Sequence, residues 1–214
     1  IAEERSAPRR VAHFNIDGKL IAEWYGGQPY YAWGAPDPRD PTWVWFNPGS
    51  WLTLAKIDQE NHSWRVMENY RQGSLAGGLL TAVSGHRGRW HVRYHDNRRY
   101  LVSESAPHVL LHETGSLRAV TVIGNCSDDM KETAKAVGYE GDPESFRWLD
   151  VNGDGLPQPD EFDFSASGHL PSGTRGVAEN FELLTVSSGR DDNRPYVRVH
   201  TTKPTWTEHG PRYP

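Results

Sequence analysis

Short runs of alternating apolar and polar residues recur along the chain, with turn-forming residues between them. Alternation with a period of two is typical of strands that bury one face. Turns every ~8–12 residues among such strands are typical of sandwiches, barrels and propellers, so the pattern predicts an all-β fold. The runs lie at 11–15, 19–25, 42–46, 52–58, 64–70, 79–84, 89–95, 99–104, 109–113, 116–123, 162–165, 181–186 and 195–200.

Two local signals refine this prediction. Asp17-Gly18 stands between two β-prone runs, which is a strong hairpin signal. Asp128 to Val137 carries the signals of helix ends, because acidic residues open it and Gly138 follows it. We therefore expect one short helix in a chain of strands.

The pattern divides the chain into three parts. Residues 1–10 form a polar leader, residues 11–200 form the predicted β domain, and residues 201–214 form a tail that looks irregular. Similar strands begin with Trp64-Arg65-Val66 and Trp90-His91-Val92, 26 residues apart. A propeller blade needs ~40–50 residues, so the chain holds about four to five blades' worth, some of it loop.

One segment, residues 150–161, fits the calcium-loop template D-x-[DN]-x-[DN]-G-x5-E at every specified position. Calcium takes ~6–8 oxygen ligands in a flexible cage. Gly155 at the sixth position allows the sharp turn, and Glu161 at the twelfth would close the shell through both carboxylate oxygens. An acidic Gly/Pro-rich surface turn is the less favoured interpretation, because all five template positions are filled in order. The predicted metal ligands are Asp150, Asn152, Asp154, the Leu156 carbonyl, Gln158 and Glu161.

The surroundings of this loop differ from those of a paired EF-hand. Pro157 and Pro159 interrupt its second half, since proline lacks a backbone N–H and fixes φ. Residues 162–165 alternate like a strand, where a second helix would follow in an EF-hand. The sequence therefore predicts an isolated calcium loop that acts as a structural staple.

Composition narrows the function classes. The 214 residues suffice for a core, and nine Trp, nine Tyr and six Phe supply much of the burial. The net charge of -5 argues against a nucleic-acid surface, which would be basic. No apolar run reaches the ~18–20 residues of a membrane span. Cys126 is the only cysteine, so no internal disulfide or thiolate zinc site is predicted.

No residue pattern in the sequence clearly indicates a catalytic site, and we assign no catalytic residues. His91 and His95 alternate on one strand face, but residues four apart on a strand lie ~13 Å from each other, too far for one ion. The acidic pairs Asp128-Asp129 and Asp191-Asp192 are typical of solvated loops. No nucleophile elbow or phosphate-binding motif is present.

Four aromatic residues are candidate partner-binding positions. Tyr30, Tyr31 and Trp33 lie in the long loop 26–41 among Gly and Pro residues, and Trp206 lies in the tail. Exposed Trp and Tyr side chains stack on sugar rings or anchor protein interfaces. The expected partners are other protein chains of an assembly or a cell-surface glycan.

The chain resembles secreted β-propeller proteins with NHL-like blades from Planctomycetes and related bacteria. The resemblance implies a propeller, either closed within this chain or completed by other segments or another subunit, and an ion-stabilised protein that is secreted, at the cell surface or periplasmic. In such proteins a stretch similar to W-x-D-x-N-G-D-G-x-x-Q-x-D-E follows a blade as a calcium loop. The resemblance covers residues 11–164 and is carried by residues 14–20, 24–27, 37–41, 99–102 and 148–161.

Two functions remain open at this point. The first is a calcium-stabilised binding or scaffolding module, or a structural subunit of an extracellular or cell-surface assembly. The alternative is a calcium-assisted polysaccharide lyase or hydrolase that uses one propeller face. Convergence of acidic, His and Arg side chains in a cleft would favour the enzyme.

Overall fold

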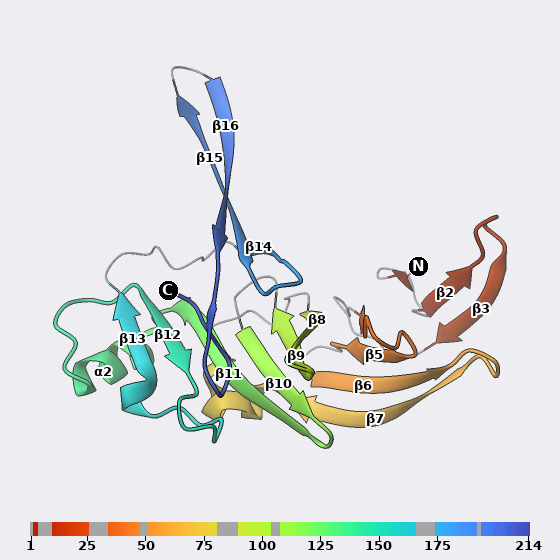
Figure 1. The fold of residues 1–214 in the computed structure, drawn as a ribbon, viewed down its shortest axis with the longest axis horizontal. Coiled ribbons are helices and arrows are strands. Elements are labelled where there is room, and N and C mark those ends of the chain that lie inside the picture. Colours follow the sequence, from red (N-terminus) through yellow and green to blue (C-terminus); the bar gives the residue numbers. More distant parts are fainter. Residues whose placement is uncertain are drawn as a thin grey trace. The chain divides into compact units, whose positions relative to one another are not determined.

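The computed structural model describes residues 2–3, 10–25, 34–47, 51–80, 90–103, 108–165, 174–191 and 194–214. Antiparallel strands dominate these residues, which confirms the β-rich class (Figure 1). The chain separates into two compact units, Ile1–Gln72 and Gly73–Pro214, whereas the sequence predicted one domain over residues 11–200. The elements of each unit follow from its own sequence pattern.

A three-stranded sheet opens unit 1. It consists of β1 (Ala2–Glu3), β2 (Arg10–Phe14) and β3 (Leu20–Tyr25). The predicted hairpin is confirmed: Gly18 has a φ of 78°, and its N–H donates to the Asn15 carbonyl at 3.1 Å. Ala2 pairs with Val11, so part of the predicted polar leader belongs to a sheet.

A four-stranded sheet completes the described part of unit 1. Its order is β4 (Gly34–Pro36), β5 (Trp43–Phe46), β6 (Trp51–Asp58) and β7 (Ser63–Arg71). Trp45, Leu52 and Leu54 are fully buried, so the inner strands carry the core of this sheet. The edge strand β7 is largely exposed. Strands β5 to β7 agree with the predicted runs to within one residue.

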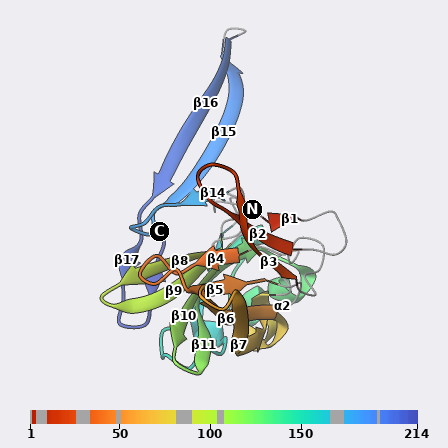
Figure 2. The same cartoon turned by 90° about the vertical axis from the view of Figure 1, so that its right-hand side faces the viewer.

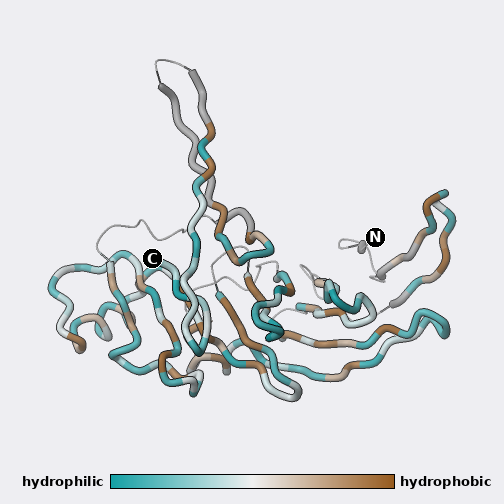
Figure 3. Tube along the Cα trace, in the orientation of Figure 1, coloured by the Kyte–Doolittle hydropathy of each residue, from teal (hydrophilic) through white to brown (hydrophobic). Residues whose placement is uncertain are grey.

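A six-stranded antiparallel meander forms the centre of unit 2. Every strand pairs with its neighbours in sequence, so the sheet contains no crossover connection. Apolar residues run along β10 (Figure 3), five of whose six residues are buried. The strands are β8 (Trp90–His95), β9 (Arg98–Ser103), β10 (His108–Glu113), β11 (Ser116–Asn125), β12 (Ser145–Leu149) and β13 (Phe162–Ser165).

The predicted helix is confirmed as α2 (Asp128–Ala136), which connects β11 to β12. Ser127 caps it, because its hydroxyl accepts from the Met130 N–H at 3.4 Å, and two aspartates stand in its first turn. Met130 and Ala134 are its buried positions. Helix α2 therefore presents one narrow apolar side to unit 2.

The C-terminal segment, residues 174–214, covers one face of the meander. It contains the sheet β14 (Thr174–Val177), β15 (Leu183–Asp191) and β16 (Arg194–Thr202), then a hairpin of β17 (Thr205–Trp206) and β18 (Pro211–Arg212). Trp206 packs against the core that these elements close. The fully or nearly buried members of this core are Tyr100, Val102, Val109, Leu111, Val120, Ile123, Val177, Phe181, Leu183 and Tyr213.

The tail is thus more ordered than the sequence predicted. Only 2% of Tyr213 is exposed, and its hydroxyl donates to the Phe181 carbonyl at 2.9 Å. Strands of two residues show no alternation, so the pattern of the sequence could not reveal them. The prediction of an irregular segment over 201–214 is corrected on this ground.

The β15–β16 hairpin extends beyond its third strand. Pairing between β15 and β16 runs from Leu183–Thr202 to Asp191–Arg194, whereas β14 reaches β15 only as far as Thr185. The remainder is a two-stranded ribbon in both views (Figures 1 and 2). Val197 and Val199 on β16 are 68% and 62% exposed.

Other sequence predictions differ from the structure locally. Leu79 and Leu80 form a helical turn rather than the start of a strand over 79–84, and residues 81–84 lie outside the described residues. Strands β4, β12 and β14 were not predicted. Among the described residues no sheet closes into a barrel and no propeller is detected.

Candidate calcium loop

The candidate metal site is the connection between β12 and β13, residues 150–161. Asp150 follows β12 directly, and its backbone N–H donates to the Val120 carbonyl of β11 at 3.1 Å. This bond continues the β11–β12 pairing and carries the Asp150 side chain into the interior, where its exposure is 0%. The first predicted ligand is therefore positioned by the sheet itself.

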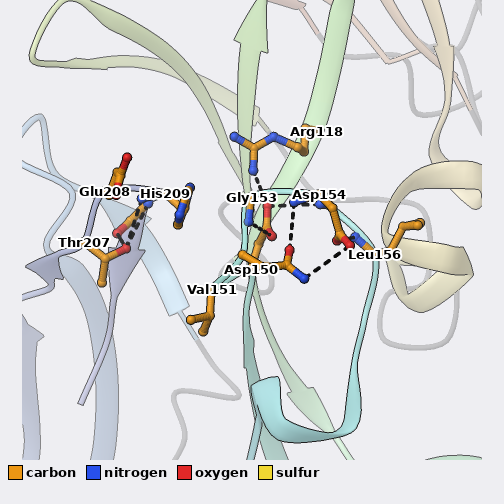
Figure 4. A network of polar contacts seen from close by, with 12 residues as sticks. Arg118, Asp150, Val151, Gly153, Asp154, Leu156, Thr207, Glu208 and His209 are labelled. Carbon is orange, nitrogen blue, oxygen red and sulfur yellow. Dashed lines mark hydrogen bonds and ion pairs between the residues drawn. The ribbon is translucent and has the colours of Figure 1, made fainter.

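Side chains in the first half of the loop hold its backbone in consecutive tight turns (Figure 4). Oδ1 of Asp150 accepts from the Gly153 N–H at 2.8 Å. Oδ1 of Asn152 accepts from the Asp154 N–H at 2.9 Å, and Oδ1 of Asp154 accepts from the Leu156 N–H at 2.7 Å. Such Asx turns fix carboxylate and amide oxygens close to the main chain that they cap.

Two glycines permit this path. Gly153 and Gly155 have φ values of 83° and 72°, in the left-handed region that favours glycine. A Cβ on Gly153 would lie 2.7 Å from Nδ1 of His209, and one on Gly155 would lie 2.6 Å from Cγ of Arg118. Both positions thus need glycine for conformation and for close packing.

Glu161 at the twelfth position turns back onto the start of the loop. Its Oε1 accepts from the Val151 N–H at 2.9 Å, and its Oε2 accepts from the Gln158 N–H at 3.1 Å and from the Trp148 indole at 2.9 Å. Only 7% of Glu161 is exposed. In this geometry Glu161 closes the loop through hydrogen bonds, where the sequence predicted bidentate coordination.

The charges of the loop are partly balanced by one cation. Arg118 of β11 forms an ion pair with the buried Asp150, and 19% of the Arg118 side chain is exposed. The Leu156 N–H, followed by the side chains of Gln158 and Asn152, lowers the pKa of Asp154, and the charge of Arg118 adds to this effect. Asp154 is consequently ionised at neutral pH.

The donor types fit calcium. Carboxylate, amide and carbonyl oxygens are hard ligands of the kind that Ca²⁺ binds. Oε1 of Gln158, the ninth loop position, is buried without a hydrogen-bond partner, which is unusual for an amide oxygen. Its amide nitrogen donates to Asp154 at 2.8 Å, so Gln158 already belongs to the loop network. The residues that would hold the ion are Asp150, Asn152, Asp154, Leu156, Gln158 and Glu161.

The carboxylates do not yet converge on one point. Within the described ranges, no group of three or more His, Cys, Asp or Glu side chains is placed to hold a metal ion. The hydrogen bonds of Glu161 and the ion pair of Asp150 account for this arrangement. Coordination through the full predicted set requires these two side chains to exchange partners.

The candidate partner-binding residues have different outcomes. Tyr30, Tyr31 and Trp33 lie outside the described residues. The Trp206 ring stacks on His95 with centroids 3.4 Å apart and planes 6° apart, and it meets the edge of Phe181. Trp206 is therefore partly buried against the core of its own unit, and its role in binding a partner stays a prediction.

His95 and Arg93 of β8 make contacts that stabilise the fold. His95 is occupied by the stack on Trp206, and Arg93 between the two histidines donates to the Val177 carbonyl at 3.0 Å. These contacts join β8 to the C-terminal segment, residues 174–214. Sequence reasoning missed Arg118 and His209 as neighbours of the loop, because they lie far from it in sequence and match no motif.

A cavity of about 370 Å³ adjoins the loop. Cations and carboxylates both line it, and Arg147 in its wall pairs with Asp163 and donates to the Tyr213 carbonyl at 2.9 Å. Apolar lining comes from β11, β12 and β13. Its charged lining residues are Arg147, Asp160, Glu161, Asp163 and Arg212.

Comparison with protein-family models and with curated proteins gives no match to this chain. No helix in the described residues combines the length and apolar character needed to cross a bilayer.

Proposed function

We propose that this chain is a calcium-stabilised β-rich module that binds or scaffolds a partner outside the cytoplasm, as part of an extracellular or cell-surface assembly. The observation that carries the proposal is the loop 150–161, whose predicted ligands Asp150, Asn152 and Asp154 hold the backbone in tight turns and in which the buried Oε1 of Gln158 lacks a hydrogen-bond partner. A bound calcium ion would balance the negative charges of this acidic turn and would coordinate the Gln158 Oε1.

The position of the loop supports a stapling role. It connects β12 to β13, bonds to β11 through Asp150, and packs against the C-terminal hairpin through Gly153 and His209. An ion that binds only the folded loop stabilises the fold by mass action, ~2.7 kcal/mol at a hundredfold excess over its dissociation constant. An ion bound in the loop would therefore stabilise β11, β12, β13 and the C-terminal hairpin together.

The scaffolding role rests on exposed apolar residues of the β15–β16 ribbon. Val197 and Val199 lie on the same face of β16 and are more than half exposed. An isolated two-stranded ribbon is at best marginally stable in water, so a partner that covers this face would stabilise it. The propeller fold and its NHL-like blades stay predictions, as does the exported location.

A calcium-assisted polysaccharide lyase or hydrolase is the second candidate. The cavity beside the loop favours it, because cationic and acidic side chains meet there as sugar acids require. Release of reducing ends or unsaturated products from acidic polysaccharides, and loss of that release in Arg147→Ala, would support this function. If the protein turns over none of the polysaccharides in a panel, the enzyme proposal is contradicted and the binding-module proposal is favoured.

Thermal melting in calcium and in chelator tests the proposed staple. We expect calcium to raise the melting temperature of the unsubstituted chain, and Asp154→Ala to remove that rise. Asp154 is exposed but accepts from the Leu156 N–H, so the substitution should lower the melting temperature modestly in chelator, and the loss of the calcium-dependent rise is the readout. Asp160→Ala is the matched control, since this acid is exposed in the same loop but fills no specified template position. A melting temperature that ignores calcium would overturn the proposal.

A further inference from the structure

The first loop ligand is already neutralised by a side chain of the protein. Asp150 has no exposed surface, and it pairs with the Nη1 of Arg118 (Figure 4). An unpaired carboxylate at such a position is strongly unfavourable, because it loses its hydration without compensation. Arg118 therefore performs, in the absence of an ion, the charge balance that a metal would perform.

The ion pair with Arg118 involves Oδ2 of Asp150, which also helps to shape the loop. Oδ2 of Asp150 accepts from the Gly155 N–H at 3.1 Å and also meets Arg118. Oδ1 accepts from the Gly153 N–H at 2.8 Å. With both oxygens engaged, a calcium ion can gain full use of Asp150 only if the guanidinium moves away.

Packing holds the arginine over the loop. Its methylenes lie against Gly155, where an added Cβ would be 2.6 Å from Cγ and 3.0 Å from Cδ of Arg118. Most of the side chain is shielded from solvent. Arg118 is thus held by packing beside the predicted ligand Asp150.

We infer that Arg118 is a built-in competitor of calcium that sets the affinity of the loop. This inference rests on the proposed calcium site and adds its regulation. A guanidinium and a calcium ion repel each other at close range and seek the same carboxylate. The loop then fills only when calcium is concentrated enough to displace the arginine, and the chelated protein stays folded because the arginine returns.

Calcium titration of Arg118→Gln separates competition from a merely structural role. Competition predicts a lower melting temperature in chelator, together with calcium binding at least about tenfold tighter, equivalent to about 1.4 kcal/mol. A structural role predicts the lower melting temperature with binding that is unchanged or weaker. Arg147→Gln is the matched control, because it removes an arginine from the ion pair with Asp163 in the same sheet, outside the loop.

Arg118→Lys keeps the test decisive if Arg118→Gln does not fold in chelator. Lysine keeps the positive charge, so competition predicts a calcium affinity within about threefold of the unsubstituted chain. Calcium binding by Arg118→Lys that is about tenfold or more tighter than that of the unsubstituted chain would overturn the inference. Failure of the unsubstituted chain and all three variants to bind calcium by calorimetry would instead overturn the proposed calcium site. Equal calcium affinity in all four proteins would overturn only the role of Arg118.

Discussion

At position 108 a histidine lies in the interior of unit 2, with 1% of its surface exposed. Its Nε2 has no hydrogen-bond partner, and burial lowers the pKa of His108 from 6.5 to about 4. The Trp90 ring lies 6.4 Å away between centroids, so the surroundings of this imidazole are aromatic and apolar. The native state therefore holds His108 in its neutral form.

This residue predicts a pH dependence of stability. Between pH 6.5 and about 4, His108 is protonated in the unfolded state but stays neutral in the folded state. The free energy of unfolding therefore falls as the pH drops through this window. The loss approaches roughly 3 kcal/mol for one fully buried histidine. His108→Leu should flatten the dependence in urea melts at pH 7, 5.5 and 4.5. An equal slope in His108→Leu and the unsubstituted chain would contradict this explanation.

The loop illustrates what single residues reveal in a sequence. Asp150, Asn152 and Asp154 were identifiable because a calcium template is local, with every specified position within twelve residues. Arg118 was not, since the ion pair joins residues 32 apart and nothing in the alternation of β11 marks that arginine. Likewise, Glu161 was assigned from its spacing, whereas its hydrogen bonds depend on how the whole turn folds back.

At the scale of elements, hairpins and the helix were predictable for the same local reason. Asp17-Gly18 and the capped stretch at Asp128 carry their structural signals within a few residues. The C-terminal hairpin does not, because its two-residue strands gain their order from distant packing. Thr121 of β11 donates to the Pro211 carbonyl across 90 residues, and Arg98 of β9 donates to that of Glu208 across 110.

The Trp206 stack gives a prediction for this hairpin. Trp206→Ala removes a ring that contacts His95, Phe181 and Tyr100, so we expect a loss of ~3–5 kcal/mol in the free energy of unfolding. Denaturant melts measure it. Trp64→Ala, at a tryptophan that is 40% exposed, should cost far less. If Trp206 served chiefly as an interface residue, its loss would change elution on a sizing column while leaving the melt intact.

At the scale of the whole molecule, the division into two units was not visible in the alternation, which continues on both sides of Gln72. Contacts concentrate within Ile1–Gln72 and within Gly73–Pro214, and the calcium loop, Arg118 and the C-terminal hairpin all belong to the second unit. Strand periodicity reports which residues face a core, but it does not report how many cores there are.

This division predicts that calcium acts on one unit only. A fragment of residues 73–214 should fold alone and show the same calcium-dependent rise in melting temperature as the full chain, since the whole site lies within it. A fragment of residues 1–72 should show no response to calcium. Circular dichroism melts of both fragments, in calcium and in chelator, make the measurement. Loss of the response from the larger fragment would mean that unit 1 contributes to the site.

The packing of the C-terminal hairpin also has a consequence for the order of events during synthesis. Gly210 lies against Val120, His209 against Gly153, and the Tyr213 carbonyl accepts from Arg147 across 66 residues. A nascent chain that has emerged only as far as β16 can pack Val177, Phe181 and Leu183 on the meander, but it lacks Trp206 and Tyr213, which complete that core. The apolar face of the meander then stays partly uncovered while the ribosome adds the hairpin at ~5–20 residues per second. Unit 2 therefore completes its fold late, and its exposure to chaperones and proteases is greatest in that interval.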